Sequence, residues 1–129
     1  MAERLLEEMA LLKSHFPNAT LHESSKWVYI PEWKLPDIWS VPTVTICFQI
    51  PDAYPGQAPY AFYVSPHDIR PKNGNGIGNT QMATDTPYGG QWLKFSWANE
   101  AWQPTAELKQ GSNLLNFVNS FRDRLLEAS

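Results

Sequence analysis

Two apolar segments joined by a proline-rich turn occupy the middle of the chain, in the stretch 41–65, VPTVTICFQIPDAYPGQAPYAFYVS. From Val44 to Ile50, apolar residues alternate with Thr, Cys and Gln, which is the period-two pattern of a half-buried strand. The turn 51–55 bends the chain, because proline fixes φ and cannot donate a ladder hydrogen bond. The alternation resumes from Tyr60 to Val64. The sequence therefore predicts two antiparallel strands connected by this turn.

Length and composition favour one domain over residues 1–129. The chain is 43% hydrophobic and 18% charged, which suffices for a core without disulfides. A net charge of −3 without a run of Lys or Arg argues against nucleic-acid and membrane partners. The lone cysteine, and an N-terminus unlike a signal peptide, predict a cytoplasmic protein. The histidines and the cysteine lack metal-ligand spacing, so we expect neither metal nor cofactor.

Helical periodicity marks the two ends of the chain. Leu5, Met9 and Leu12 recur at i, i+4 and i+7, which predicts a helix over 2–15. A second helix is predicted over 112–126, where apolar residues again share one face. The charged residues of the first helix are expected at the surface: Glu3, Glu7, Glu8 and Lys13.

The segments between the helices predict an α+β domain. Residues 27–30 are expected to form the first strand of a meander, followed by a connection over 33–42. Residues 66–90 are expected to form a long loop, whose part 73–79 is dense in Gly and Asn. A tryptophan-rich segment follows at 91–104. The order is helix, antiparallel meander, long loop, tryptophan-rich segment and helix.

This order and the proline-rich turn resemble the ubiquitin-conjugating (UBC) superfamily over most of the chain. The superfamily joins two strands by a D-Y-P-x-x-P-P turn, which reads here Asp52-Ala53-Tyr54-Pro55-Gly56-Gln57-Ala58-Pro59. It also places W-x-P after the active-site segment, and Trp102-Gln103-Pro104 matches that motif. One helix follows, where typical members carry two more, and the family's usual catalytic cysteine is missing. On both counts the chain is most similar to the short prokaryotic family E branch. The resemblance implies a UBC-like fold with an N-terminal helix, an antiparallel β-meander, a long active-site loop and a C-terminal helix packed on the sheet.

The resemblance also implies a bacterial ubiquitin-like protein conjugation pathway. A conjugating enzyme is an acyl transferase that accepts the C-terminus of the modifier on a nucleophile and passes it to an amine. The implied partners are a ubiquitin-like protein and its activating enzyme, with a deconjugating peptidase encoded beside them. Cysteine suits this chemistry because its thiolate is a strong nucleophile near neutral pH.

The family's cysteine nucleophile follows the second of the two strands, where this chain has none. Cys47 lies within the first strand, and we expect it to be a small buried residue. Ser96, six residues before Trp102, falls near the nucleophile's position and could carry the modifier as an oxyester. A hydroxyl needs a base or an acidifying neighbour for this, and His67 and Asp85 are the helpers suggested by loop position.

Three interpretations stay open on the sequence. The first is a noncanonical conjugating enzyme that uses Ser96. The second is a catalytically inactive UBC variant that binds a ubiquitin-like protein or its activating enzyme as a scaffold, with Ser96 only capping or turning the chain. The third is an RWD-type contact domain, which the Trp-x-Pro segment disfavours. In the family, the face that would carry Thr43, Thr45, Cys47 and Gln49 binds ubiquitin noncovalently, and the mildly polar character of this face is compatible with that.

Overall fold

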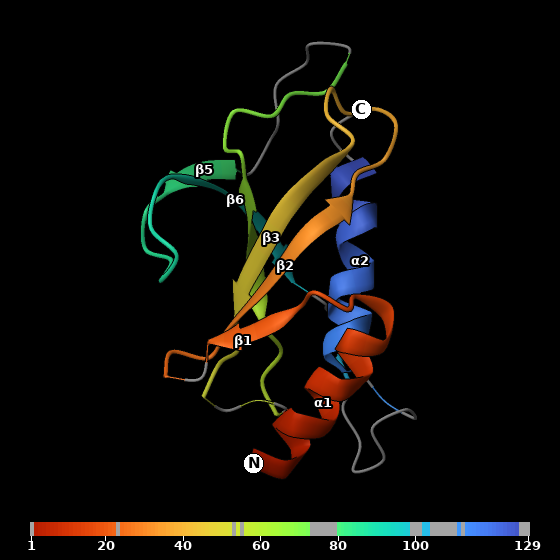
Figure 1. The fold of residues 1–129 in the computed structure, drawn as a ribbon, viewed down its shortest axis with the longest axis vertical. Coiled ribbons are helices and arrows are strands. Elements are labelled where there is room, and N and C mark those ends of the chain that lie inside the picture. Colours follow the sequence, from red (N-terminus) through yellow and green to blue (C-terminus); the bar gives the residue numbers. More distant parts are fainter. Residues whose placement is uncertain are drawn as a thin grey trace.

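The structure is a computed structural model that describes residues 2–22, 24–52, 54, 56–72, 80–98, 102–103, 111 and 113–126. This part of the chain forms two helices and one sheet of six strands (Figure 1). In chain order the elements are α1 (Ala2–His15), β1 (Thr20–His22), β2 (Trp27–Lys34), β3 (Thr43–Gln49), β4 (Tyr60–Ser65), β5 (Thr80–Ala83), β6 (Trp92–Ala98) and α2 (Leu114–Leu126). Neighbouring strands are antiparallel, in the order β1-β2-β3-β4-β6-β5.

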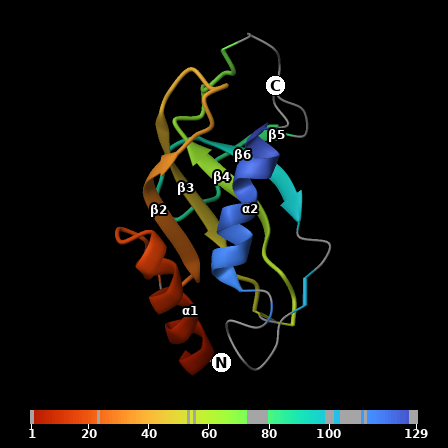
Figure 2. The same cartoon turned by 90° about the vertical axis from the view of Figure 1, so that its right-hand side faces the viewer.

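Both helices cover the same face of the sheet, with α1 beside α2 (Figure 2). The core lies between this face and the helices. The Phe62 ring stacks on Phe121 of α2 with 4.1 Å between ring centroids, and Phe48 meets Phe117 edge-on at 5.2 Å. All four rings are fully buried, and burial of each contributes about 1.5–3 kcal/mol. The expected α+β architecture, with the C-terminal helix packed on the sheet, is confirmed.

The helices follow the predicted periodicity closely. α1 has the predicted bounds and ends just before Pro17, and α2 lies within the predicted range. Asn113 caps α2 reciprocally with Asn116: the Asn113 Oδ1 accepts from the Asn116 N–H at 2.8 Å, and the Asn116 Oδ1 accepts from the Asn113 N–H at 3.2 Å. This arrangement satisfies backbone donors that a helix start leaves unpaired. Neither described helix is long and apolar enough to span a membrane.

Three strands of the sheet were not predicted. β1 and β5 are only 3 and 4 residues long, too short for a recognisable alternation. The segment 66–90 is therefore not one uninterrupted loop, although its part 73–79 lies outside the described residues. β6 buries Trp92 on one face of the sheet and Leu93 on the other, so this apolar pair interrupts the alternation that Leu93, Phe95 and Trp97 otherwise show.

The second strand is longer than predicted because of a β-bulge. Ile30 pairs with Ile46 and Trp33 with Val44, so Pro31 and Glu32 together oppose one residue of β3. Trp33 and Lys34 therefore belong to β2 and not to the expected connection. The extra residue returns Trp33 to the helix-facing side, where it is buried with Ile30. Glu32 adopts a left-handed φ of 57° at this point.

Candidate functional site

Ser96, the predicted nucleophile, is exposed on β6. Its neighbours Phe95 and Trp97 turn toward α2, and the Trp97 Nε1 donates to the Ser120 hydroxyl at 2.8 Å. Since side chains alternate along a strand, the Ser96 hydroxyl points away from the helices. Its backbone carbonyl accepts from the Arg124 Nε at 3.2 Å. Within the described residues, the hydroxyl itself has no hydrogen-bond partner.

The strand position of Ser96 is irregular. Tyr60 pairs with Ala98 and Phe62 with Phe95, so two residues of β6, Ser96 and Trp97, oppose Ala61 alone. Such bulges bend a strand and re-aim its side chains, and they occur often beside functional sites. The bulge leaves the Ser96 side chain open to solvent at the sheet surface.

A group of three contacting side chains lies beside Ser96 in the sheet. It consists of Lys94, Tyr63 and Asp85. The Lys94 Nζ lies 5.6 Å from the centre of the Tyr63 ring, and the Tyr63 hydroxyl donates to the Asp85 carboxylate at 3.3 Å. Burial, and then the charge of Asp85, raise the pKa of Tyr63 to about 12, so the phenol stays a neutral donor near neutral pH. The Asp85 carboxylate is thus hydrogen-bonded to Tyr63 and not to Ser96. Neither Lys94 nor Tyr63 was predicted as a site residue, although Lys94 stands two residues before Ser96 and therefore shares its face by alternation.

His67, the other predicted helper, lines a separate groove of about 480 Å3 beside β5. The groove also contacts Met82 and Leu93, and Leu93 belongs to the helix-facing core. Neither Ser96 nor Asp85 lines this groove. The structure places neither His67 nor Asp85 in hydrogen-bond contact with the Ser96 hydroxyl, and the catalytic roles of these three residues stay predictions.

Cys47 is the single cysteine of the chain. It is 0% exposed and packs with Trp27, Tyr63 and Trp92 in a small cluster on the face remote from the helices. Its burial confirms the expectation that a free cysteine on the sheet is a small buried residue. Desolvation by this burial, and then the charge of Asp85, raise the pKa of the Cys47 thiol far above its ordinary range. Without access or ionisation, the thiol is a poor acyl acceptor in this conformation.

The segment 84–91, called the strap below, covers this cluster. It joins β5 to β6 and crosses the face opposite the helices (Figure 1). Tyr88 of the strap packs 4.8 Å from the Tyr29 ring centroid and donates through its hydroxyl to the Trp27 carbonyl at 3.4 Å. The strap leads into β6 through Gly89, which has a φ of 74°. The Gly89 carbonyl accepts a hydrogen bond from the Trp92 Nε1 at 2.9 Å.

The strap changes the expected polar face of the sheet. Of the residues expected there, Cys47 is sealed beneath the strap cluster, while Thr43 and Gln49 remain exposed and Thr45 is half-buried. The centre of this face is therefore aromatic and covered by the chain itself. A partner that bound there as the family resemblance implies would meet the strap first.

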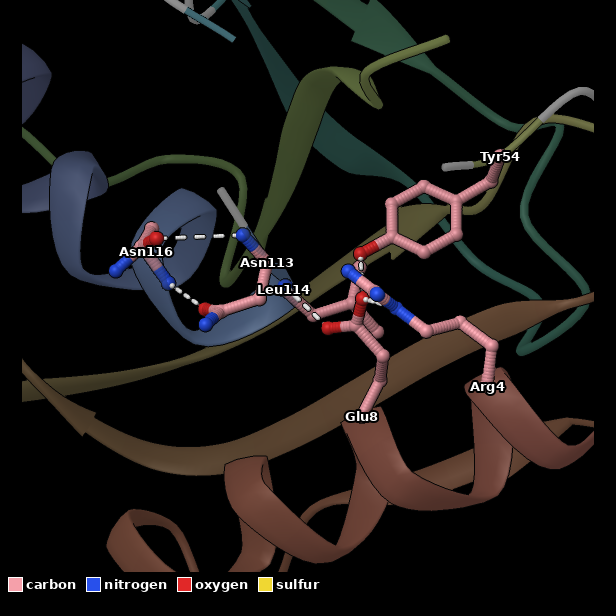
Figure 3. A network of polar contacts seen from close by, with 6 residues as sticks. All are labelled: Arg4, Glu8, Tyr54, Asn113, Leu114 and Asn116. Atoms are coloured by element: carbon pink, nitrogen blue, oxygen red, sulfur yellow. Dashed lines mark hydrogen bonds and ion pairs between the residues drawn. The ribbon is translucent and has the colours of Figure 1, made fainter. Parts of the chain in front are cut away.

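The tyrosine of the proline-rich turn serves the fold. Figure 3 shows the Glu8 carboxylate accepting from the Tyr54 hydroxyl, from the Arg4 Nε at 2.9 Å and from the Leu114 backbone N–H at 2.7 Å. The Glu8 side chain is 0% exposed, so its predicted surface position is wrong. Burial, and then the hydrogen bond to Glu8, raise the pKa of Tyr54 far above its usual value. One carboxylate thus joins the turn to both helices and places a negative charge at the start of α2.

Among the described residues, no group of three or more His, Cys, Asp or Glu side chains could hold a metal ion. The site therefore contains the exposed hydroxyl of Ser96, the buried thiol of Cys47 and the neutral phenol of Tyr63, which is hydrogen-bonded to Asp85. We find no described base in contact with either nucleophile.

In a comparison with known protein families, the prokaryotic E2 family E matches residues 5–114, which include α1 from Leu5 onward, the complete sheet and the first residue of α2. No curated protein and no solved structure matches the chain. The match covers most of the sequence, and it confirms the branch that the sequence resemblance indicated. The chain therefore belongs to the prokaryotic E2 family E and is a ubiquitin-conjugating-like protein.

Proposed function

We propose that this protein works in a bacterial ubiquitin-like protein conjugation pathway by binding the modifier and its activating enzyme, without carrying the modifier as a thioester. Family membership supports the E2-like role and its two partners. A deconjugating peptidase of the same pathway is a further expected associate. We propose that no thioester forms because the only cysteine of the chain, Cys47, is 0% exposed beneath the strap.

The scaffold role is favoured over catalysis by the surroundings of Ser96. A serine hydroxyl is a weak nucleophile unless a base or an acidifying group contacts it. Within the described residues the Ser96 hydroxyl has no such contact, and Asp85 is bonded to Tyr63 instead. The protein would then position a modifier or an activating enzyme and leave acyl transfer to a partner.

A second candidate function is oxyester formation on Ser96, which the β-bulge favours because it presents the exposed hydroxyl at the sheet surface. In this reaction the Ser96 oxygen attacks the activated C-terminal carbonyl of the modifier. The hydroxyl proton passes to a base, and the leaving group of the activating enzyme departs. Lys94, two residues earlier on the same face, is the nearest candidate for that base by strand position.

A charging assay distinguishes the two roles. The protein is incubated with ATP and with the ubiquitin-like protein and activating enzyme encoded beside its gene, and products are separated with and without thiol reductant and hydroxylamine. Binding of the modifier or the activating enzyme without a covalent adduct supports the scaffold. A reductant-resistant, hydroxylamine-labile adduct, lost in Ser96→Ala but kept in the control Ser40→Ala, establishes the oxyester. If the protein neither binds these partners nor forms an adduct, the proposed pathway role is overturned.

A further inference from the structure

A groove of about 390 Å3 lies between the end of α1, the second half of β2 and α2. It is lined by Phe16 after α1, by Trp33 and Lys34 of β2 and by Arg122 of α2. None of its residues belongs to the strap or to the groove around His67. It is therefore a separate feature, on the helix side of the sheet.

The bottom of this groove is apolar and fixed. Trp33 is 6% exposed and is held by the β2 bulge, which turns it toward the helices. Phe16 is half-buried beside it. The left-handed φ of Glu32 is part of the same bulge, and a non-glycine residue holds such a conformation only where its surroundings enforce it. The groove thus has a preformed aromatic base.

The rim of the groove is basic in a protein whose net charge is −3. His15, Lys34 and Arg122 face a single acidic residue, Glu32. In the part of the chain that the structure describes, neither Lys34 nor Arg122 makes an ion pair or a side-chain hydrogen bond. Two cations beside an aromatic surface attract carboxylates, and the apolar surroundings strengthen that attraction relative to open water.

We propose that this groove binds an acidic peptide segment of a partner protein, with one large apolar side chain on Trp33 and Phe16 and flanking carboxylates on Lys34 and Arg122. The volume lies near the lower end of ligand pockets, which span roughly 300–1,000 Å3, so it suits one anchoring side chain. Tryptophan and arginine are also the residues that most often dominate binding energy at interfaces. The charge complementarity favours an acidic partner over a basic one.

The test is a titration of the 15N-labelled full-length protein with the peptides acetyl-Glu-X-Asp-amide, where X is Leu, Phe or Trp. The matched basic peptides carry Lys in place of both acidic residues. Lys34→Glu/Arg122→Glu reverses the rim, and Arg70→Glu/Lys72→Glu makes the same charge change at two exposed positions outside the groove. All four residues are exposed, so both variants are expected to fold.

We expect saturable shifts of the Trp33 indole N–H and the Arg122 amide with at least one acidic peptide, weakened by salt. The rim variant should bind at least about tenfold more weakly, while the control double variant keeps its affinity. Three results would overturn the proposal: no saturable shift with any acidic peptide, equal binding of the basic peptides, or equal weakening in both double variants.

Discussion

The hydroxyl of Tyr54 donates a hydrogen bond to the buried carboxylate of Glu8, and so ties the proline-rich turn to the first helix (Figure 3). The same carboxylate accepts from the backbone N–H of Leu114 at the start of α2. The tyrosine that made the turn recognisable in the sequence therefore acts as a structural clamp. This role is independent of catalysis, which explains how the turn can persist in a chain without an accessible cysteine.

Replacement of Glu8 by Gln should destabilise the protein strongly. The change removes the charge that faces the Arg4 guanidinium and the first turn of α2, and breaking a buried ion pair costs about 3–5 kcal/mol. Urea denaturation followed by circular dichroism measures the loss in the free energy of unfolding. Glu7→Gln, at an exposed position of the same helix, should change this free energy by less than about 0.5 kcal/mol. Equal effects of the two substitutions would contradict the clamp.

Tyr54→Phe should cost less than Glu8→Gln. It removes only the hydroxyl and leaves the buried carboxylate one donor short, which costs about 1–3 kcal/mol. Tyr60→Phe is the matched control, because Tyr60 is 59% exposed. The same denaturation experiment reports both variants. A Tyr54→Phe protein as stable as the wild type would show that the hydroxyl contributes no net stability.

Removal of the Tyr88 side chain should expose Cys47 to solvent more often. Tyr88 holds the strap against Tyr29 and the Trp27 carbonyl, and the thiol lies in the cluster beneath. Loss of about 1.4 kcal/mol of these contacts raises the population of open molecules about tenfold. The rate of reaction with a chromogenic disulfide measures this in Tyr88→Ala and in the control Tyr60→Ala. An unchanged rate in Tyr88→Ala would mean that the strap does not limit access to the thiol.

Alkaline pH should weaken the fold through Tyr63 and Tyr88. Burial is the main cause that raises the pKa of each to about 12, against about 10 for an unfolded tyrosine. Between these values the unfolded chain releases protons that the folded chain keeps, so the free energy of unfolding falls as pH rises from about 10 to about 12. Denaturant midpoints across this range measure the fall. It should be shallower in Tyr63→Phe/Tyr88→Phe, and an equal slope in this double variant would refute the assignment.

Sequence reasoning succeeded where one periodic pattern dominated. The alternation in β3 and β4 and the helical repeat of α1 predicted these elements correctly, and the usual burial of free cysteine predicted a buried Cys47. It failed for β6, where Trp92 on the strap side stands directly before the helix-facing Leu93 and obscures the alternation of Leu93, Phe95 and Trp97. It also failed for Glu8, since helical periodicity cannot show that Tyr54 and Leu114 supply partners for a buried charge.

The candidate site was harder to predict for a different reason. The relation of Ser96 to His67 depends on which side of the sheet each side chain takes, and loop position alone carries no such information. The bulge at Ser96 arises from the pairing of β4 with β6, so it is invisible in either strand alone. Lys94 could have been found from its spacing of two residues from Ser96 if β6 had been recognised as a strand.

We propose that this E2-like protein binds its pathway partners without forming a thioester on Cys47. Intact-protein mass spectrometry of the charging reaction, at several times and with a Cys47→Ala variant beside the wild type, tests it most directly. We expect no reductant-sensitive adduct in either protein, while the modifier or the activating enzyme still binds to both. A reductant-sensitive adduct that forms on the wild type and is absent from Cys47→Ala would contradict it.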